Sequence, residues 1–162
     1  MNYIKEETSV VFQELPDHIS LTFSITGCGH KCKGCHSPYL QNENNGEELS
    51  IEKFVEYIEG NRGYITAVIF FGGEQYDDML LMLDIARSYK LKTCLYTGNK
   101  KVSRVILSKL DFIKTGEFIE RLGGLTSATT NQRMVNVATG EDITYKFNNT
   151  GELDDRIDRS TT

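Results

Sequence analysis

Residues 64–71 read Tyr-Ile-Thr-Ala-Val-Ile-Phe-Phe, a run of apolar, β-branched and aromatic side chains that Gly72-Gly73 ends. A continuous run of this kind predicts a strand that is buried on both faces, as in a parallel sheet. Helical patterns precede and follow it, at residues 50–59, where Ser50 is the expected N-cap, and at residues 76–89. Because strands that alternate with helices indicate βαβ units, the run predicts an α/β fold.

The flanking segments extend this pattern. Residues 19–26 alternate between apolar and polar side chains, and residues 8–14 form a second extended run, so the two predict an antiparallel N-terminal hairpin. The other expected elements are strands at residues 91–97 and 111–118, a helix at residues 101–110, and two strands at residues 135–138 and 143–147 that could pair across Thr139-Gly140.

The chain length limits how far such a fold can close. A complete eightfold barrel needs about 250 residues, and the 162 residues here have room for about four or five βα steps. We therefore expect a partial, open-sided (β/α) barrel with a mostly parallel sheet and an N-terminal hairpin. It would form a single domain over residues 1–150, followed by a polar, disordered tail at residues 151–162. An open side suits a substrate that is the loop of another protein.

Composition narrows the classes of partner. The formal net charge is −5, which argues against unspecific binding to nucleic acid or to an anionic membrane. No apolar run approaches the roughly 18 residues of a membrane-spanning helix, and the first residues have no apolar signal core. We therefore expect a cytoplasmic protein whose cysteines are reduced, and there clustered cysteines favour metal binding or catalysis over disulfides.

Three cysteines are clustered directly after residues 19–26. Cys28, Cys32 and Cys35 have the spacing C-x3-C-x2-C, so three thiolates from one loop could hold one metal cluster. A four-iron cluster normally takes four thiolates, so three would leave one iron open. His30 and His36 also allow a Cys3His zinc site, although structural zinc usually uses two separated knuckles.

The fourth cysteine, Cys94, lies inside the apolar strand at residues 91–97. Free cysteine is among the most buried residue types, so core packing is the expected role, with a distant fourth ligand as the alternative.

The cysteine loop, Gly72-Gly73-Glu74 and Tyr96-Thr97-Gly98 each follow an expected strand. Right-handed crossovers place the carboxyl ends of parallel strands at one edge of a sheet, where such sheets bind ligands. The three segments are therefore predicted to converge on one pocket. Glycine would let the backbone approach a ligand closely, and Glu74 would add a negative charge beside a ligand's ammonium group.

Together these segments resemble the radical S-adenosylmethionine (AdoMet) superfamily. Within it, the chain is similar to the activating proteins of anaerobic ribonucleoside-triphosphate reductases, over roughly residues 8–135. The residues that carry the resemblance are Phe23-Ser-Ile-Thr-Gly-Cys-Gly-His-Lys-Cys-Lys-Gly-Cys-His-Ser-Pro38, Phe71-Gly-Gly-Glu74, Tyr96-Thr-Gly98 and Thr129-Thr-Asn-Gln-Arg133.

The resemblance implies a role for each matching residue. Cys28, Cys32 and Cys35 would hold a [4Fe-4S] cluster, and the amino and carboxylate groups of S-adenosyl-L-methionine would chelate the fourth iron. The methionyl end would contact Gly72, Gly73 and Glu74, the adenosyl part would lie against Gly34, Cys35 and His36, and Tyr96 and Thr97 would line the same pocket. Many superfamily members have an aromatic residue where this chain has Gly34, so an adenine contact would have to come from backbone or from His36.

The resemblance also implies a reaction and partners. A one-electron donor, such as a reduced flavodoxin-type protein, would reduce the cluster, and AdoMet would be cleaved to methionine and a 5′-deoxyadenosyl radical. That radical would take a hydrogen atom from a glycine of the large glycyl-radical subunit of anaerobic ribonucleotide reductase. No side-chain general base is required, because the chemistry belongs to the cofactor.

The sequence leaves three alternatives open. The chain could activate another glycyl-radical enzyme, or act on a small molecule as a deazapurine-type radical-AdoMet enzyme. It could also be a zinc-stabilised binding module without catalysis. The sequence does not contain the partner, so the target glycine, the electron donor and the stoichiometry are not determined by it.

Overall fold

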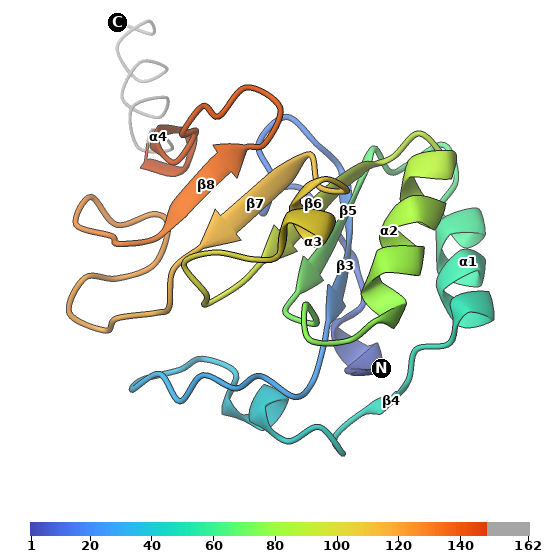
Figure 1. The fold of residues 1–162 in the computed structure, drawn as a ribbon, viewed down its shortest axis with the longest axis horizontal. Coiled ribbons are helices and arrows are strands. Elements are labelled where there is room, and N and C mark those ends of the chain that lie inside the picture. Colours follow the sequence, from blue (N-terminus) through green and yellow to red (C-terminus); the bar gives the residue numbers. More distant parts are fainter. Residues whose placement is uncertain (149–162) are drawn as a thin grey trace, which may run out of the picture.

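The computed structural model describes residues 1–148 (Figure 1), and within them a six-stranded sheet forms the centre of the fold. The order of its strands is β2-β3-β5-β6-β7-β8. The strands are β2 (Val10–Val11), β3 (Ser20–Ser24), β5 (Ala67–Phe71), β6 (Lys92–Tyr96), β7 (Phe112–Thr115) and β8 (Arg133–Asn136). The remaining elements are β1 (Asn2–Tyr3), β4 (Glu47–Glu48), two 3-10 turns (Lys5–Glu7 and Pro38–Gln41) and the helices α1 (Ile51–Gly60), α2 (Asp78–Ser88), α3 (Arg104–Leu107) and α4 (Tyr145–Asn148).

The sheet is mostly parallel, as the alternation of strands and helices predicts. The pairs β3–β5, β5–β6 and β6–β7 are parallel, whereas β2–β3 and β7–β8 are antiparallel. The predicted N-terminal hairpin is confirmed in shortened form, because only Val10 and Val11 pair with β3. A separate two-stranded antiparallel sheet joins β1 to β4 and was not predicted. Closure of the six-stranded sheet toward a partial barrel stays a prediction.

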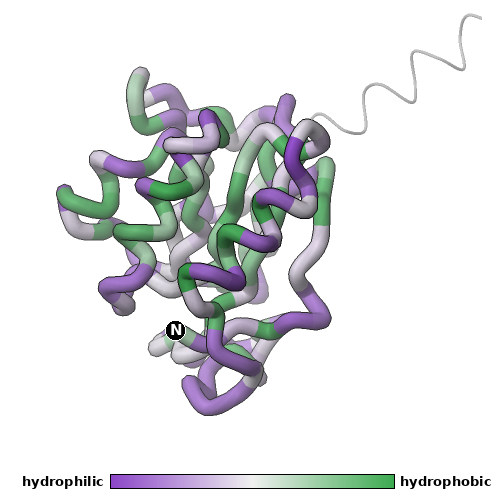
Figure 2. Tube along the Cα trace, turned by 90° about the vertical axis from the view of Figure 1, so that its right-hand side faces the viewer, coloured by the Kyte–Doolittle hydropathy of each residue, from purple (hydrophilic) through white to green (hydrophobic). Residues whose placement is uncertain are grey.

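Both faces of the sheet are covered, which explains the unbroken apolar run in β5. Helices α1 and α2 lie side by side along one face (Figure 1), where Phe54 and Met82 pack with Phe70. On the other face Ile69 packs with Phe147 of α4. Successive residues of a strand point to opposite faces, so a strand that is covered twice needs apolar residues at every position. Figure 2 shows the hydrophobic segments gathered in these strands and helices and the hydrophilic ones in the connecting loops.

Local capping fixes where α1 begins. The backbone N–H of Lys53 donates to Ser50 Oγ at 3.1 Å, which confirms Ser50 as the N-cap. The apolar stripe of the helix then places Phe54 and Ile58, four residues apart, in the core. None of the helices within residues 1–148 is long and apolar enough to cross a membrane.

One expectation near the C-terminus is wrong. Residues 143–147 do not form a strand that pairs with residues 135–138, because a single bridge joins Val135 to Asp142 and the chain then turns into α4. Ile143 and Phe147 are buried but Tyr145 between them is exposed, so the segment lacks the alternation of a half-buried strand. The predicted tail at residues 151–162 lies outside the described residues.

Candidate functional site

A cavity of about 500 Å³ lies at the carboxyl edge of the parallel strands. The cysteine loop, the segment after β5 and the segment after β6 all contribute to its wall, so the predicted convergence of the three segments is confirmed. The lining residues are Ile25, Gly27, Cys28, Gly29, His30, Cys35, Ser37, Leu40, Gln41, Phe71, Gly72, Gly73, Glu74, Gln75, Tyr96, Thr97, Gly98, Asn99 and Lys114.

The three clustered cysteines are free thiols that are partly exposed. Cys28 and Cys35 line this cavity, whereas Cys32 lines a neighbouring hollow of about 370 Å³ beside residues 117–121. Within residues 1–148, no three histidine, cysteine or carboxylate side chains are gathered closely enough to hold a metal ion. A cluster ligated by all three thiols therefore requires the loop to bring them closer together.

The chemistry of the loop fits an iron–sulfur cluster. Its three thiols have no disulfide partner, and thiolate is the ligand that such clusters take. A Cβ at Gly29 would have no atom within 4 Å, so there is open space next to Cys28. The backbone N–H of Ser37 already donates to Cys35 Sγ at 3.4 Å, and hydrogen bonds to cluster sulfurs adjust the reduction potential.

The base of the cysteine loop is anchored on both sides. The Leu40 carbonyl accepts the backbone N–H groups of Gly27 and Cys28, at 2.7 and 2.9 Å. From the segment after β5, Gln75 Nε2 donates to the Gly27 carbonyl at 3.0 Å and the Tyr76 hydroxyl to the Thr26 carbonyl at 3.1 Å. The backbone that carries the first thiol is therefore held beside the Gly-Gly-Glu segment.

Backbone conformation explains the two glycines of that segment. Gly72 and Gly73 have φ angles of 78° and 101°, which residues that carry a side chain rarely adopt. A Cβ at Gly73 would also lie 2.7 Å from Met79 Cε and 3.1 Å from Ile25. The chain can therefore make its sharp exit from β5, and carry Glu74 to the wall of the cavity, only with glycine at this point.

The Tyr96 ring lines the cavity while its hydroxyl is engaged elsewhere. That hydroxyl donates to the Glu14 carbonyl, and the ring lies edge-on to Phe71 with 5.0 Å between ring centres. Burial raises the pKa of Tyr96 well above its ordinary value. Thr97, which is almost fully buried, donates its hydroxyl to Glu74 Oε1. Both residues line the cavity, and their contact with AdoMet stays a prediction.

Gly34 and His36 do not line the cavity. A Cβ at Gly34, where φ is 72°, would lie 3.1 Å from Glu120 Oε1, and the His36 ring lies 5.1 Å from the ring centre of Phe118. Both face the loop that follows β7. Their assignment to the adenosyl part of AdoMet stays a prediction, and in this arrangement only Cys35 of that trio borders the cavity.

Lys114 is a cavity residue that the sequence reasoning missed. Its side chain is only 8% exposed, its Nζ donates to the Gly116 carbonyl at 2.9 Å, and burial lowers its pKa to about 8. No carboxylate within residues 1–148 lies within ion-pair distance of it. The available signal was a lysine inside the apolar strand Phe112-Ile-Lys-Thr115. Glu74 and Lys114 give the cavity wall one carboxylate and one ammonium group.

Cys94 is fully buried and packs with Ile69 and Met134 on the sheet face that α4 covers. Burial raises its pKa, which disfavours the thiolate that a metal needs. It does not line the cavity, and core packing is confirmed as its role.

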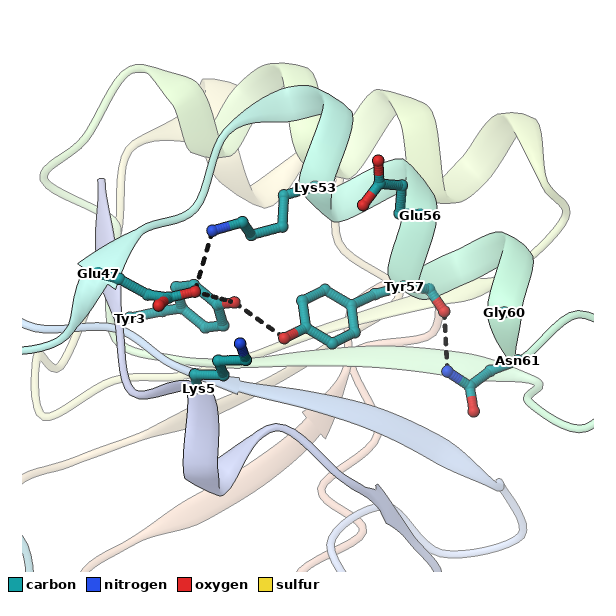
Figure 3. A pocket seen from close by; sticks show the side chains of 8 residues that line it. All are labelled: Tyr3, Lys5, Glu47, Lys53, Glu56, Tyr57, Gly60 and Asn61. Carbon is teal, nitrogen blue, oxygen red and sulfur yellow. Dashed lines mark hydrogen bonds and ion pairs between the residues drawn. The ribbon is translucent and has the colours of Figure 1, made fainter.

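A second pocket, of about 360 Å³, lies between α1 and the β1–β4 pair (Figure 3). Its polar groups largely satisfy one another, because the hydroxyls of Tyr3 and Tyr57 lie 2.8 Å apart and Lys53 Nζ lies 2.9 Å from Glu47 Oε1. Burial, followed by the hydrogen bond with Tyr57, raises the pKa of Tyr3. These bonds fasten the N-terminal strand to α1, and the pocket contains no cysteine.

A family model described as a 4Fe-4S single cluster domain matches residues 19–135 of the chain. The chain belongs to this family. Members of the 4Fe-4S single cluster domain family are named for an iron–sulfur cluster, so membership favours such a cluster over the zinc module considered above. The matched range begins before the cysteine loop and ends in β8, and it includes every segment that lines the cavity. No curated protein and no solved structure matches the chain significantly.

Proposed function

We propose that the protein is a radical-AdoMet activase, which cleaves S-adenosyl-L-methionine reductively and installs a glycyl radical on anaerobic ribonucleoside-triphosphate reductase. The observation that carries the proposal is the cavity itself. Two thiols of the C-x3-C-x2-C loop border it, and its charged groups are the carboxylate of Glu74 and the ammonium of Lys114. AdoMet has an α-amino and an α-carboxylate group, which match that pair of charges.

Each residue of the wall has a part in this function. Cys28, Cys32 and Cys35 would ligate three irons of a [4Fe-4S] cluster and leave the fourth for the ligand. Glu74 would accept a hydrogen bond from the ligand's amino group, and Lys114 would balance its carboxylate. When bound, the cluster would supply one electron. That electron would break the C5′–S bond of AdoMet and yield methionine and a 5′-deoxyadenosyl radical.

The protein's own contribution is orientation and exclusion of water. The backbone of Gly72 and Gly73 would border the methionyl end, while the rings of Phe71 and Tyr96 form an apolar part of the wall. No side chain is needed as a general base, because the target loses a hydrogen atom rather than a proton.

The Thr129–Arg133 block, which carries part of the resemblance, braces the exit of β7. Asn131 Nδ2 donates to the Glu117 carbonyl at 3.0 Å, and Gln132 Nε2 donates to the Gly116 carbonyl at 3.3 Å. The same Gly116 carbonyl accepts from Lys114, so the block fixes the backbone that orients this ammonium group.

We propose the large glycyl-radical subunit as the protein substrate and a reduced flavodoxin-type protein as the electron donor.

The deciding experiment is incubation of anaerobically reconstituted protein with AdoMet, a strong reductant and the large reductase subunit. Electron paramagnetic resonance should then detect a glycyl doublet on the reductase, and 5′-deoxyadenosine should accumulate. A doublet on a different glycyl-radical protein would show that the protein is an activase of that enzyme instead. Colourless protein that contains one zinc ion and cleaves no AdoMet would overturn the proposal.

A further inference from the structure

The carboxylate of Glu74 is held by two donors from the loop that follows β6. Asn99 Nδ2 donates to Glu74 Oε1 at 2.8 Å, and the Thr97 hydroxyl donates to the same oxygen. The Asn99 backbone N–H in turn donates to Thr97 Oγ1 at 2.9 Å. Since both donors take Oε1, the other oxygen of Glu74 accepts no hydrogen bond within residues 1–148 and stays available to a ligand.

The other end of the Asn99 amide reaches the cysteine loop. Asn99 Oδ1 lies 3.2 Å from Nε2 of His30, which stands between Cys28 and Cys32. Because an amide oxygen can only accept, His30 must carry its proton on Nε2 in this bond. A Cβ at Gly98 would lie 2.6 Å from His30 Cδ2, so the ring rests directly on the backbone beside Asn99.

We propose that Asn99 is a positioning residue that holds the Glu74 carboxylate toward the amino group of the ligand and, through His30, ties the cysteine loop to that carboxylate. This inference rests on the proposed function. Neither Asn99 nor His30 has a place in the ligand or metal roles that the resemblance implies.

Asn99 can connect the two segments because the NH2 group of its amide donates to Glu74 and the oxygen of the same amide accepts from His30. A free glutamate on a cavity wall rotates, so ordering it on ligand binding costs conformational entropy. Asn99 removes this cost in advance by fixing one oxygen. Its second bond spans from position 99 to position 30, and it joins the segment that recognises the amino group to the segment that carries the thiols. Occupancy of the cavity and the placement of the cysteine loop are therefore coupled.

The test is AdoMet binding to anaerobically reconstituted protein, together with iron content per chain. Asn99→Ala should raise the AdoMet dissociation constant about tenfold or more, because it removes a hydrogen bond to a charged group. Asn99→Asp should raise the dissociation constant at least as much, since it loses the donor and adds a like charge beside Glu74. His30→Ala should weaken binding and lower iron content, whereas His30→Gln keeps a donor for Asn99 Oδ1 and should restore both.

The coupling has its own signature. The effects of Asn99→Ala and His30→Ala should combine to less than their product in the double variant, because the two residues act through one bond. Lys101→Ala is the matched control, an exposed side chain in the same loop that makes no hydrogen bond within residues 1–148, and it should bind AdoMet and iron as the wild type does. Circular dichroism and thermal unfolding identify any variant that has lost its fold.

Two outcomes would overturn the inference, and they are distinguishable. If the wild type binds AdoMet and folded Asn99→Ala binds it equally well, Asn99 does not position Glu74 and only this inference fails. If the reconstituted wild type binds no AdoMet, the proposed function fails as well. If the effects of the two substitutions on AdoMet binding multiply in the double variant, Asn99 and His30 act independently, and the proposed link to the cysteine loop is wrong.

Discussion

The ammonium group of Lys114 lies 6.0 Å from the centre of the Tyr96 ring, on the wall of the cavity that Cys28 and Cys35 border. A buried lysine without a carboxylate partner is costly, and its one hydrogen bond to the Gly116 carbonyl offsets only part of that cost. A site that keeps such a charge favours an anionic group on its ligand.

Lys114→Met should therefore affect affinity and stability in opposite directions. Loss of the charge should weaken AdoMet binding about tenfold, while the thermal midpoint should hold or rise, because a buried charge that lacks a carboxylate partner is replaced by an apolar chain of similar length. Isothermal titration of reconstituted protein and thermal unfolding measure the two effects. Lys101→Met, at an exposed position, is the control and should change neither. Unchanged affinity in Lys114→Met would show that the ligand's carboxylate lies elsewhere.

Two cysteine variants separate ligation from packing. Cys32→Ser should lose the cluster and AdoMet cleavage, since a hydroxyl replaces one of three proposed thiolate ligands. Cys94→Ser should keep both but lower the free energy of unfolding by about 1–3 kcal/mol, because it places a hydroxyl in an apolar cluster. Iron analysis and chemical denaturation measure these effects. Loss of iron from folded Cys94→Ser would contradict its assignment to the core.

Gly73→Ala tests the exit from β5. The φ of 101° and the 2.7 Å approach to Met79 Cε should together make the variant less stable by more than about 1 kcal/mol, and they should displace Glu74. Gly60→Ala is a useful contrast, because a Cβ there meets nothing within 4 Å and lies in α1, so it should be neutral or stabilising. Chemical denaturation compares the two. Equal stability of Gly73→Ala and the wild type would contradict the close contact.

Asp111 should contribute stability that depends on pH. Burial tends to raise its pKa, but the backbone N–H of Thr93 at 3.0 Å and the ion pair with Lys92 outweigh this and hold the pKa below its ordinary value. A carboxyl whose pKa is lower in the folded state stabilises that state above its unfolded pKa and loses the effect as the pH falls through the folded one.

Asp111→Asn should consequently lower the free energy of unfolding by about 1–2 kcal/mol near neutral pH. The difference from the wild type should shrink at pH values below about 4, where the unfolded carboxyl takes up its proton. Urea denaturation at several pH values checks this. A difference that stays constant from neutral to acidic pH would show that charge is not the cause.

Several elements could be predicted because their signals are local. The apolar run ending at Phe71 predicts a doubly covered strand, and Ser50 predicts the start of α1, since both depend on side-chain spacing within one segment. The prediction of a strand at residues 143–147 was wrong because a short apolar run fits a strand or a helix equally well. Tertiary packing decided the outcome, because Ile143 and Phe147 join a buried cluster with Ile69 and Met134.

The sequence by itself determined the thiol loop, the glycines that follow β5 and the meeting of three strand ends at one edge, because parallel strand order follows from the alternation of elements. Only the tertiary structure decided which further side chains reach that edge. Lys114, and the chain of contacts from Glu74 through Asn99 to His30, join positions far apart in the sequence. Their meeting depends on the register of β5, β6 and β7 and on the path of each loop, which no local pattern encodes.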